Sequence, residues 1–210
     1  MTGRILSFGP LLAGRADPPA ARPGASRRPA AAPKADETPL GPQEAERFRQ
    51  LFLPHLDGAY SFARYLCRDA TQAEDLAQDA FVRAFRGFRG FRGGDPRAWL
   101  FAIVRSSFHT WVRGRATWTP APADALERTP SDDDTPETAL LRQDEAHSVR
   151  AAIEDLPEPF REALVLRELE ELSYRDIAEI TGAPIGTVMS RLARARQMLL
   201  AALGPLEGAP

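Results

Sequence analysis

The chain has very few of the residues on which several common protein architectures depend. Among its 210 residues there is one cysteine, Cys67, so no disulfide can form within the chain, as expected in a reducing compartment. We interpret Cys67 as a small buried hydrophobe. No apolar run approaches the roughly 20 residues that span a bilayer. Arg4 and Arg15 flank the short apolar patch near the start, so we expect no signal peptide, no membrane insertion and a cytoplasmic location.

The residue patterns of common enzymes are also missing. The three histidines, His55, His109 and His147, are scattered without the spacing of metal ligands. No glycine-rich phosphate loop follows a strand, and no nucleophile elbow is present. Carboxylates are plentiful, but we expect them on solvated faces or in linkers. The sequence therefore predicts a protein that is not an enzyme, without catalytic residues, bound metal or cofactor.

Composition divides the chain into five parts. Residues 1–43 are dominated by Pro, Ala, Gly and Arg, and we expect a disordered tail because they cannot bury enough apolar surface. Residues 115–145 contain three arginines against eight acids, which is typical of a flexible acidic linker. Apolar residues recur at helical spacing elsewhere, and no segment alternates with the period of a strand. We predict an all-α fold with two small helical modules, 44–114 and 146–203, and a C-terminal tail, 204–210.

The first module is expected to be a bundle of three amphipathic helices. Pro54 is expected to begin a new turn within the first of them. Asp95 and Pro96 have the positions of an N-cap and a first helical residue in the third. An apolar stripe with a 3.6-residue period defines the second: Leu76, Ala77, Ala80, Phe81, Ala84 and Phe85.

The second module contains the pattern of a helix-turn-helix. Ser173 is expected to cap the first helix with Asp176 three residues later, and Gly182 to end it. Pro184 then begins the last helix, whose expected packing face consists of Ile185, Val188, Leu192, Ala195 and Leu199. Its opposite face is predicted to enter the DNA major groove, with Arg196 as a further cation: Thr187, Met189, Ser190, Arg191 and Arg194. The alternative is a solvated arginine face on an ordinary helical hairpin.

Four segments carry a resemblance to one family. Residues 156–168 (LPEPFREALVLRE) and 172–196 (LSYRDIAEITGAPIGTVMSRLARAR) resemble the fourth conserved region of extracytoplasmic-function (ECF) sigma factors. Upstream, 73–81 (AEDLAQDAF) and 96–105 (PRAWLFAIVR) resemble two helices of the second region of that family. The resemblance spans about 44–203 without the linker. It implies a sigma factor that directs promoter-specific initiation in a stress or envelope response.

The resemblance also implies partners and binding residues. The partners are core RNA polymerase (through the coiled coil of its largest subunit and its flap), promoter DNA and an anti-sigma factor. The second-region helix implies a polymerase contact at Glu74, Asp75, Gln78, Asp79 and Phe81. The melted −10 element is expected at Arg89, Arg92, Arg105, Ser106, His109 and Arg113. The exposed face of the last helix, defined above, is expected to bind the −35 element.

Two alternatives and four departures remain at this point. The loop 85–94 interleaves phenylalanine with arginine, which suits either stacking on single-stranded DNA or packing phenylalanines beside solvated arginines. A stand-alone helix-turn-helix regulator would explain 172–200 but would leave 73–105 without a purpose. This chain has Ser106 where the family often has Asn, and Thr110 where it often has Asp. It has Met189 where the family commonly has Lys or Arg, and Ala193 where it often has His.

Overall fold

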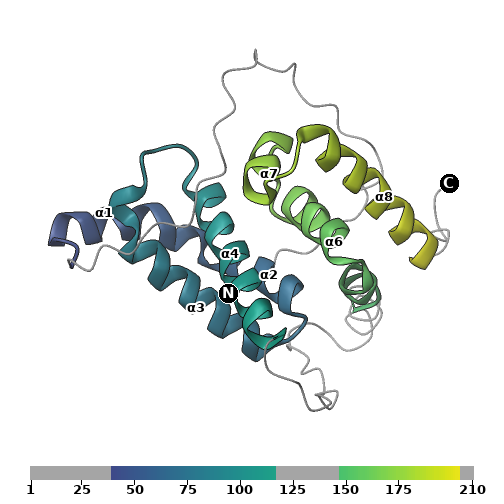
Figure 1. Ribbon diagram of the computed structural model, residues 1–210, viewed down its shortest axis with the longest axis horizontal. Coiled ribbons are helices and arrows are strands. Elements are labelled where there is room, and N and C mark those ends of the chain that lie inside the picture. The colour runs from purple at the N-terminus through teal and green to yellow at the C-terminus, as the bar shows by residue number, and fades with distance from the viewer. Residues whose placement is uncertain (1–38, 117–146, 204–210) are drawn as a thin grey trace, which may run out of the picture.

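The computed structural model describes residues 39–116 and 147–203, and within these ranges every regular element is helical (Figure 1). The expected tails and linker therefore lie mostly outside the described residues. The first module contains α1 (Pro42–Phe52), η1 (Leu53–His55), α2 (Leu56–Cys67), α3 (Ala70–Arg86), η2 (Phe88–Gly90) and α4 (Pro96–Ala116). The second contains a helical stretch at 147–155, then α6 (Glu158–Leu164), the π-helical turn η3 (Val165–Leu169), α7 (Tyr174–Thr181) and α8 (Ile185–Leu203).

The first module has four principal helices, and the prediction of three was wrong. The new turn expected at Pro54 is present as η1, and it separates α1 from α2. Proline lacks the N–H of a continuing helix, so the break falls at this residue. Asp69 caps α3 by accepting a hydrogen bond from the Gln72 N–H at 2.8 Å. The predicted cap of α4 is confirmed, since the Asp95 carboxylate accepts from the Arg97 N–H at 2.9 Å.

Aromatic rings hold α1, the loop 85–94 and α4 together. Phe52 is 0% exposed, and its ring centroid lies 5.4 Å from that of Phe91 and 5.2 Å from that of Trp99. Phe88 is buried against Phe48 and Phe52. The phenylalanines at 88 and 91 therefore pack inward, which favours the packing alternative for this loop over base stacking.

The second module forms the expected helix-turn-helix. The Ser173 hydroxyl accepts from the Asp176 N–H at 3.2 Å, and Gly182 ends α7 with a φ of 66°. A residue with a side chain would be strained in that left-handed conformation. On α8, four of the five residues of the predicted packing face are buried, but Ile185 is 47% exposed. A side chain on a helix packs over the turn that precedes it. Because Ile185 is the first residue of α8, no preceding turn of this helix exists for its side chain to cover.

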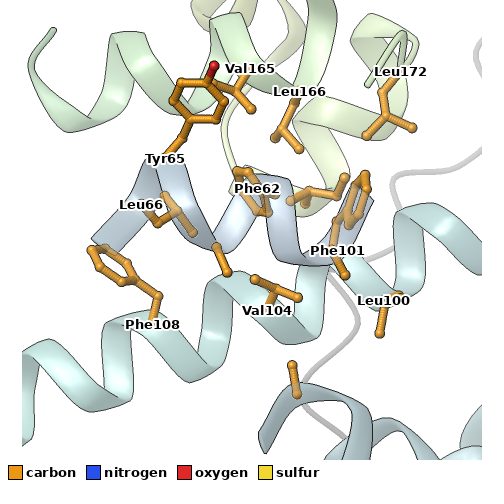
Figure 2. Close-up of a cluster of buried hydrophobic side chains, with 14 of the residues drawn as sticks. Phe62, Tyr65, Leu66, Leu100, Phe101, Val104, Phe108, Val165, Leu166 and Leu172 are labelled. Carbon is orange, nitrogen blue, oxygen red and sulfur yellow. The ribbon is translucent and has the colours of Figure 1, made fainter. Parts of the chain in front are cut away.

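The two modules lie against one another. Helix α2 contacts α6 and η3, and α4 contacts α7 (Figure 1). Figure 2 shows one apolar cluster that runs from α2 and α4 into the second module, with Phe62 and Tyr65 pointing toward Val165 and Leu166. The sequence indicated two modules on a tether and gave no sign of this contact.

Cys67 ends α2 and is half-buried against the core rather than fully buried. Burial and the neighbouring Asp69 raise the pKa of its thiol to about 11. The thiol is therefore protonated at neutral pH, which is consistent with a packing role.

We expect Phe52→Ala to reduce the free energy of unfolding by about 3–5 kcal/mol, because it removes the central ring of the aromatic cluster and leaves a cavity. Urea denaturation followed by circular dichroism would measure the change. Leu53→Ala, at the exposed neighbouring position, is the matched control and should cost well under ~1 kcal/mol. Equal losses for the two variants would contradict the role assigned to Phe52.

Candidate nucleic-acid interface

The predicted recognition face of α8 is accessible along the first three turns of the helix. Met189 is 52% exposed, and Ser190 and Arg194 are also exposed, whereas Thr187 and Arg191 are half-buried. The Ser190 hydroxyl donates to the Thr187 carbonyl at 2.9 Å. The face therefore offers hydroxyls, a guanidinium and one thioether, which are groups that can read base edges in a major groove.

Arg196 differs from the other two arginines of α8. Its guanidinium pairs with the Glu168 carboxylate of η3, with Nη2–Oε1 at 2.5 Å and Nε–Oε1 at 3.1 Å. This pair fastens α8 to η3, and the role of Arg196 as a cation for DNA stays a prediction. Arg194 instead points along the exposed face, with Nη1 3.4 Å from the Gln197 amide oxygen.

On α4, the residues predicted for the −10 strand lie in different surroundings. Arg113 is exposed, whereas Arg105, Ser106 and His109 are half-buried. The Arg105 Nε lies 2.5 Å from the Glu162 Oε1 of α6. Glu162 is only 3% exposed. Burial raises the pKa of Glu162, while the guanidiniums of Arg105 and Arg191 act in the opposite direction.

His109 also faces the second module. Its Nδ1 lies 3.8 Å from the Glu158 Oε1. Burial and the nearby Arg105 guanidinium lower the pKa of His109, and the Glu158 carboxylate acts against them. The imidazole is therefore neutral near pH 7, and its contact with Glu158 is then a polar contact rather than an ion pair.

The two arginines predicted in the loop before α4 have separate roles. The Arg89 guanidinium clasps the Glu44 carboxylate with two hydrogen bonds, Nε–Oε1 at 3.1 Å and Nη2–Oε2 at 3.0 Å, and a third reaches the Pro39 carbonyl. Arg89 thereby joins the loop to the start of α1. Arg92 is exposed. Of this pair, Arg92 is the better placed to meet a phosphate.

The predicted polymerase-binding face of α3 is largely accessible. Glu74, Asp75, Gln78 and Asp79 are exposed, and Asp79 pairs with Arg83 one turn later at 2.7 Å. Phe81 is half-buried, edge-on to Phe48. The sequence reading missed Val82, which is 46% exposed beside this rim. Val82 does not belong to the apolar stripe of α3, and this position could have indicated from sequence that the side chain is exposed.

Two further features bear on function. Within residues 39–116 and 147–203, no three His, Cys, Asp or Glu side chains lie close enough to hold a metal ion. Among the helices of the same ranges, none is long and apolar enough to cross a membrane.

Both modules match known families. Residues 51–117 match the family described as Sigma-70 region 2, and residues 146–199 match Sigma-70, region 4. The sigma-H factor of Pseudomonas aeruginosa is 42% identical over 147 residues, which cover 66% of this chain and 76% of that protein. The ECF sigma-E factor of Haemophilus influenzae is 35% identical over 152 residues, which cover 68% of this chain and 79% of that protein. The chain belongs to the ECF family of RNA polymerase sigma factors.

A solved structure of a sigma factor has a similar fold. The sigma factor RpoE of Bartonella quintana, crystallised with the anti-sigma factor NepR, has a TM-score of 0.65 and 28% identity. The comparison covers 78% of this chain and 99% of that one. The family resemblance and the all-helical fold predicted from sequence are confirmed. This ECF sigma factor is a transcription initiation factor, and the alternative of a stand-alone regulator does not account for the match at 51–117.

We expect Arg196→Ala to destabilise the sigma factor by about 1–3 kcal/mol, because the largely buried Glu168 would lose its charged hydrogen-bond partner. Arg194→Ala, two residues earlier on the exposed face, should change stability by less than ~0.5 kcal/mol. Thermal unfolding of both variants would measure the difference. A stable Arg196→Ala protein would show that the guanidinium is not a structural group.

Proposed function

We propose that this sigma factor uses three faces for three partners. The rim of α3 binds core RNA polymerase, at the coiled coil of its largest subunit. The exposed residues of α4, together with Arg92 in the loop before it, capture the melted −10 strand. The polar face of α8 reads the −35 element while the second module contacts the polymerase flap. The observation that carries the proposal is that these faces lie on the two modules that match sigma-70 regions 2 and 4.

The α3 face suits a protein partner better than DNA. Four exposed polar side chains, three of them acidic, precede Val82 and Phe85 on α3, and both of these are large exposed hydrophobics. Apolar contacts within a polar rim are the usual anatomy of a protein interface. Exposed carboxylates would repel a phosphate backbone, so nucleic acid is the less suitable occupant.

The α8 face suits duplex DNA. Arg194 can donate to guanine or phosphate, and Ser190 can meet either base. Met189, exposed where the family often has Lys or Arg, can contact a thymine methyl group. Fewer cations on this helix predict a shallow salt dependence and weak binding to DNA without polymerase.

The α4 end suits a single strand. Arg113, near the C-terminal end of α4, is an exposed cation, and Ser106 and His109 are polar groups on the same helix; Arg92, in the loop before α4, is a second exposed cation. A base flipped from the strand would exchange its stacking for contacts with side chains of this kind. Thr110 is a neutral side chain where the family often has Asp. Its hydroxyl donates to the Ser106 carbonyl at 2.9 Å.

Two further proposals concern the regulation of this sigma factor and its location in the cell. The RpoE relative was crystallised with an anti-sigma factor, and we infer a partner of this class for the present chain. We place its action in the cytoplasm, where RNA polymerase works, and in a stress or envelope response.

Run-off transcription with core polymerase and fragmented genomic DNA from the source organism would test these roles. The wild-type sigma factor should yield discrete transcripts that share upstream elements. Arg194→Ala should lower yield from the −35-dependent promoters by a factor equivalent to about 1–3 kcal/mol, without preventing co-elution with core polymerase. Arg175→Ala, an exposed arginine on α7, is the matched control and should retain the yield.

The polymerase face is tested separately by co-elution. Asp75→Arg should prevent binding to core polymerase, because it reverses a charge within the α3 face. Glu46→Arg makes the same change on exposed α1 and should leave binding intact. Normal binding by Asp75→Arg, or loss of binding in both variants, would assign the polymerase contact elsewhere.

A further inference from the structure

The π-helical turn η3 leads from α6 into the helix-turn-helix of the second module. Its hydrogen bonds are wider than those of an α-helix, since the Glu170 N–H donates to the Val165 carbonyl, five residues back, at 3.0 Å. The Leu172 N–H donates to the Leu166 carbonyl, six residues back, at 3.0 Å. Glu171, within this turn, has a φ of 52°, in the left-handed region that favours glycine. Turns of this kind are rare and occur mostly at functional sites, and such strain persists only where the surroundings hold it in place.

Two neighbouring residues of η3 contact the two different helices of the helix-turn-helix. The Glu168 carboxylate, only 16% exposed, forms the ion pair with Arg196 of α8 described above. The Arg167 guanidinium lies over the ring of Tyr174, the first residue of α7, 4.6 Å from the ring centroid. Arg167 Nη1 also donates to the Leu172 carbonyl at 2.9 Å, just before α7 begins. One short turn is therefore fastened to both α7 and α8.

Tyr174 connects these two contacts. Burial alone would lower the pKa of Arg196, but its hydrogen bonds to Glu168 and Tyr174 outweigh this effect and raise the pKa. Arg196 thus contacts η3 and α7 at the same time. Partly buried polar groups that are linked in this way hold a more defined geometry than an exposed ion pair does.

The position of Arg196 on α8 relates this network to the predicted recognition face. Arg196 follows Met189 by seven residues, about two helical turns, so both lie on the same stripe of the helix. Helix α8 continues without interruption from Ile185 to Leu203, and a rotation at one point therefore turns the whole helix. The rotation that is set at Arg196 is the rotation at which Met189 is 52% exposed.

Apolar packing alone does not set this rotation sharply. The buried face of α8 consists of Val188, Leu192, Ala195 and Leu199, whose contacts are not directional. A hydrogen-bonded ion pair is directional, because it weakens steeply when its angle changes. The Glu168–Arg196 pair therefore supplies an orientation that the apolar face lacks.

We propose that Glu168 is a positioning residue for the −35 element, which acts through Arg196 to set the rotation of the recognition helix. Glu168 contacts no DNA itself, and Arg167 holds α7 in the matching position. Contacts to base edges in the major groove depend on the angle at which a side chain arrives, so a turned helix loses discrimination between bases. The inference rests on the proposed reading of the −35 element by α8.

Promoter discrimination measures positioning separately from folding. Holoenzyme with each sigma variant, at a limiting concentration, would transcribe a promoter recovered from the genomic run-off assay and the same promoter with its −35 element replaced. The ratio of the two yields is the −35 preference. Glu168→Gln removes the charge but keeps the size of the side chain, and it should lower this ratio about three- to tenfold. Co-elution with core polymerase and the circular dichroism spectrum should remain those of the wild type.

Glu179→Gln is the matched control. It makes the same substitution in the same module, in an exposed ion pair with Arg175 at 3.3 Å on α7. The −35 preference of this variant should equal that of the wild type. If Glu168→Gln does not fold, Glu168→Asp keeps the charge but shortens the side chain, and it should give a ratio between those of the wild type and a promoter-blind protein.

A charge-reversed pair separates positioning from direct binding of DNA by Arg196. If Arg196 bound DNA and Glu168 merely competed for it, Glu168→Gln would raise promoter affinity, which is the opposite of the loss expected here. Arg196→Glu alone should lower the −35 preference, and the double variant Glu168→Arg with Arg196→Glu should recover at least half of it. Position 196 is then acidic, so the recovery cannot come from a cation at that position.

Two outcomes would overturn the positioning role. One is a folded Glu168→Gln protein with the −35 preference of the wild type, and the other is a double variant that performs no better than Arg196→Glu alone. A wild-type ratio close to one would instead show that α8 does not read a −35 element, and the proposed function of this face would fail together with the positioning role. A high wild-type ratio that Glu168→Gln leaves unchanged rejects the positioning role alone.

Discussion

A carboxylate that is 3% exposed needs its charge matched within the protein, and for Glu162 the ion-pair partner, Arg105, comes from the other module. Removing an ionised carboxylate from water is costly, and burial accordingly raises the pKa of this group. The Arg105 guanidinium offsets that cost only while α4 lies beside α6. The electrostatics of a single residue on α6 therefore depend on how the two modules are docked.

The arginines of this sigma factor divide into structural and exposed groups. Arg161 is buried and donates to the backbone carbonyls of Glu154 at 3.0 Å and Leu156 at 2.7 Å, so it organises the chain before α6. Arg89 and Arg196 similarly hold a loop and a helix in place. A planar guanidinium can make several directed hydrogen bonds, which suits these roles. The cations left for nucleic acid are the exposed ones, among them Arg92, Arg113 and Arg194.

Local patterns in the sequence predicted the helices well but their partners poorly. Ser173, Gly182 and Asp95 act within a few residues of their own position, so spacing alone indicated their caps. The pairs Arg89–Glu44, Arg105–Glu162 and Arg196–Glu168 join residues 45, 57 and 28 positions apart, and no periodicity encodes such contacts. The same limit explains why the family motifs indicated two modules without indicating that they dock. The roles of the exposed residues remain predictions, because they concern partners outside the chain.

The interface between the two modules combines apolar packing with a charged rim. An apolar centre alone would hold the modules together regardless of what else is present, because water competes for it only weakly. A rim of arginines facing carboxylates is different, since phosphates and acidic protein surfaces offer the same guanidiniums an equivalent partner. A buried ion pair adds little net stability compared with apolar packing, but it can be exchanged for another pair. The contact between Arg105 and Glu162 therefore adds direction to the docking of the two modules, which the apolar cluster beside it does not supply.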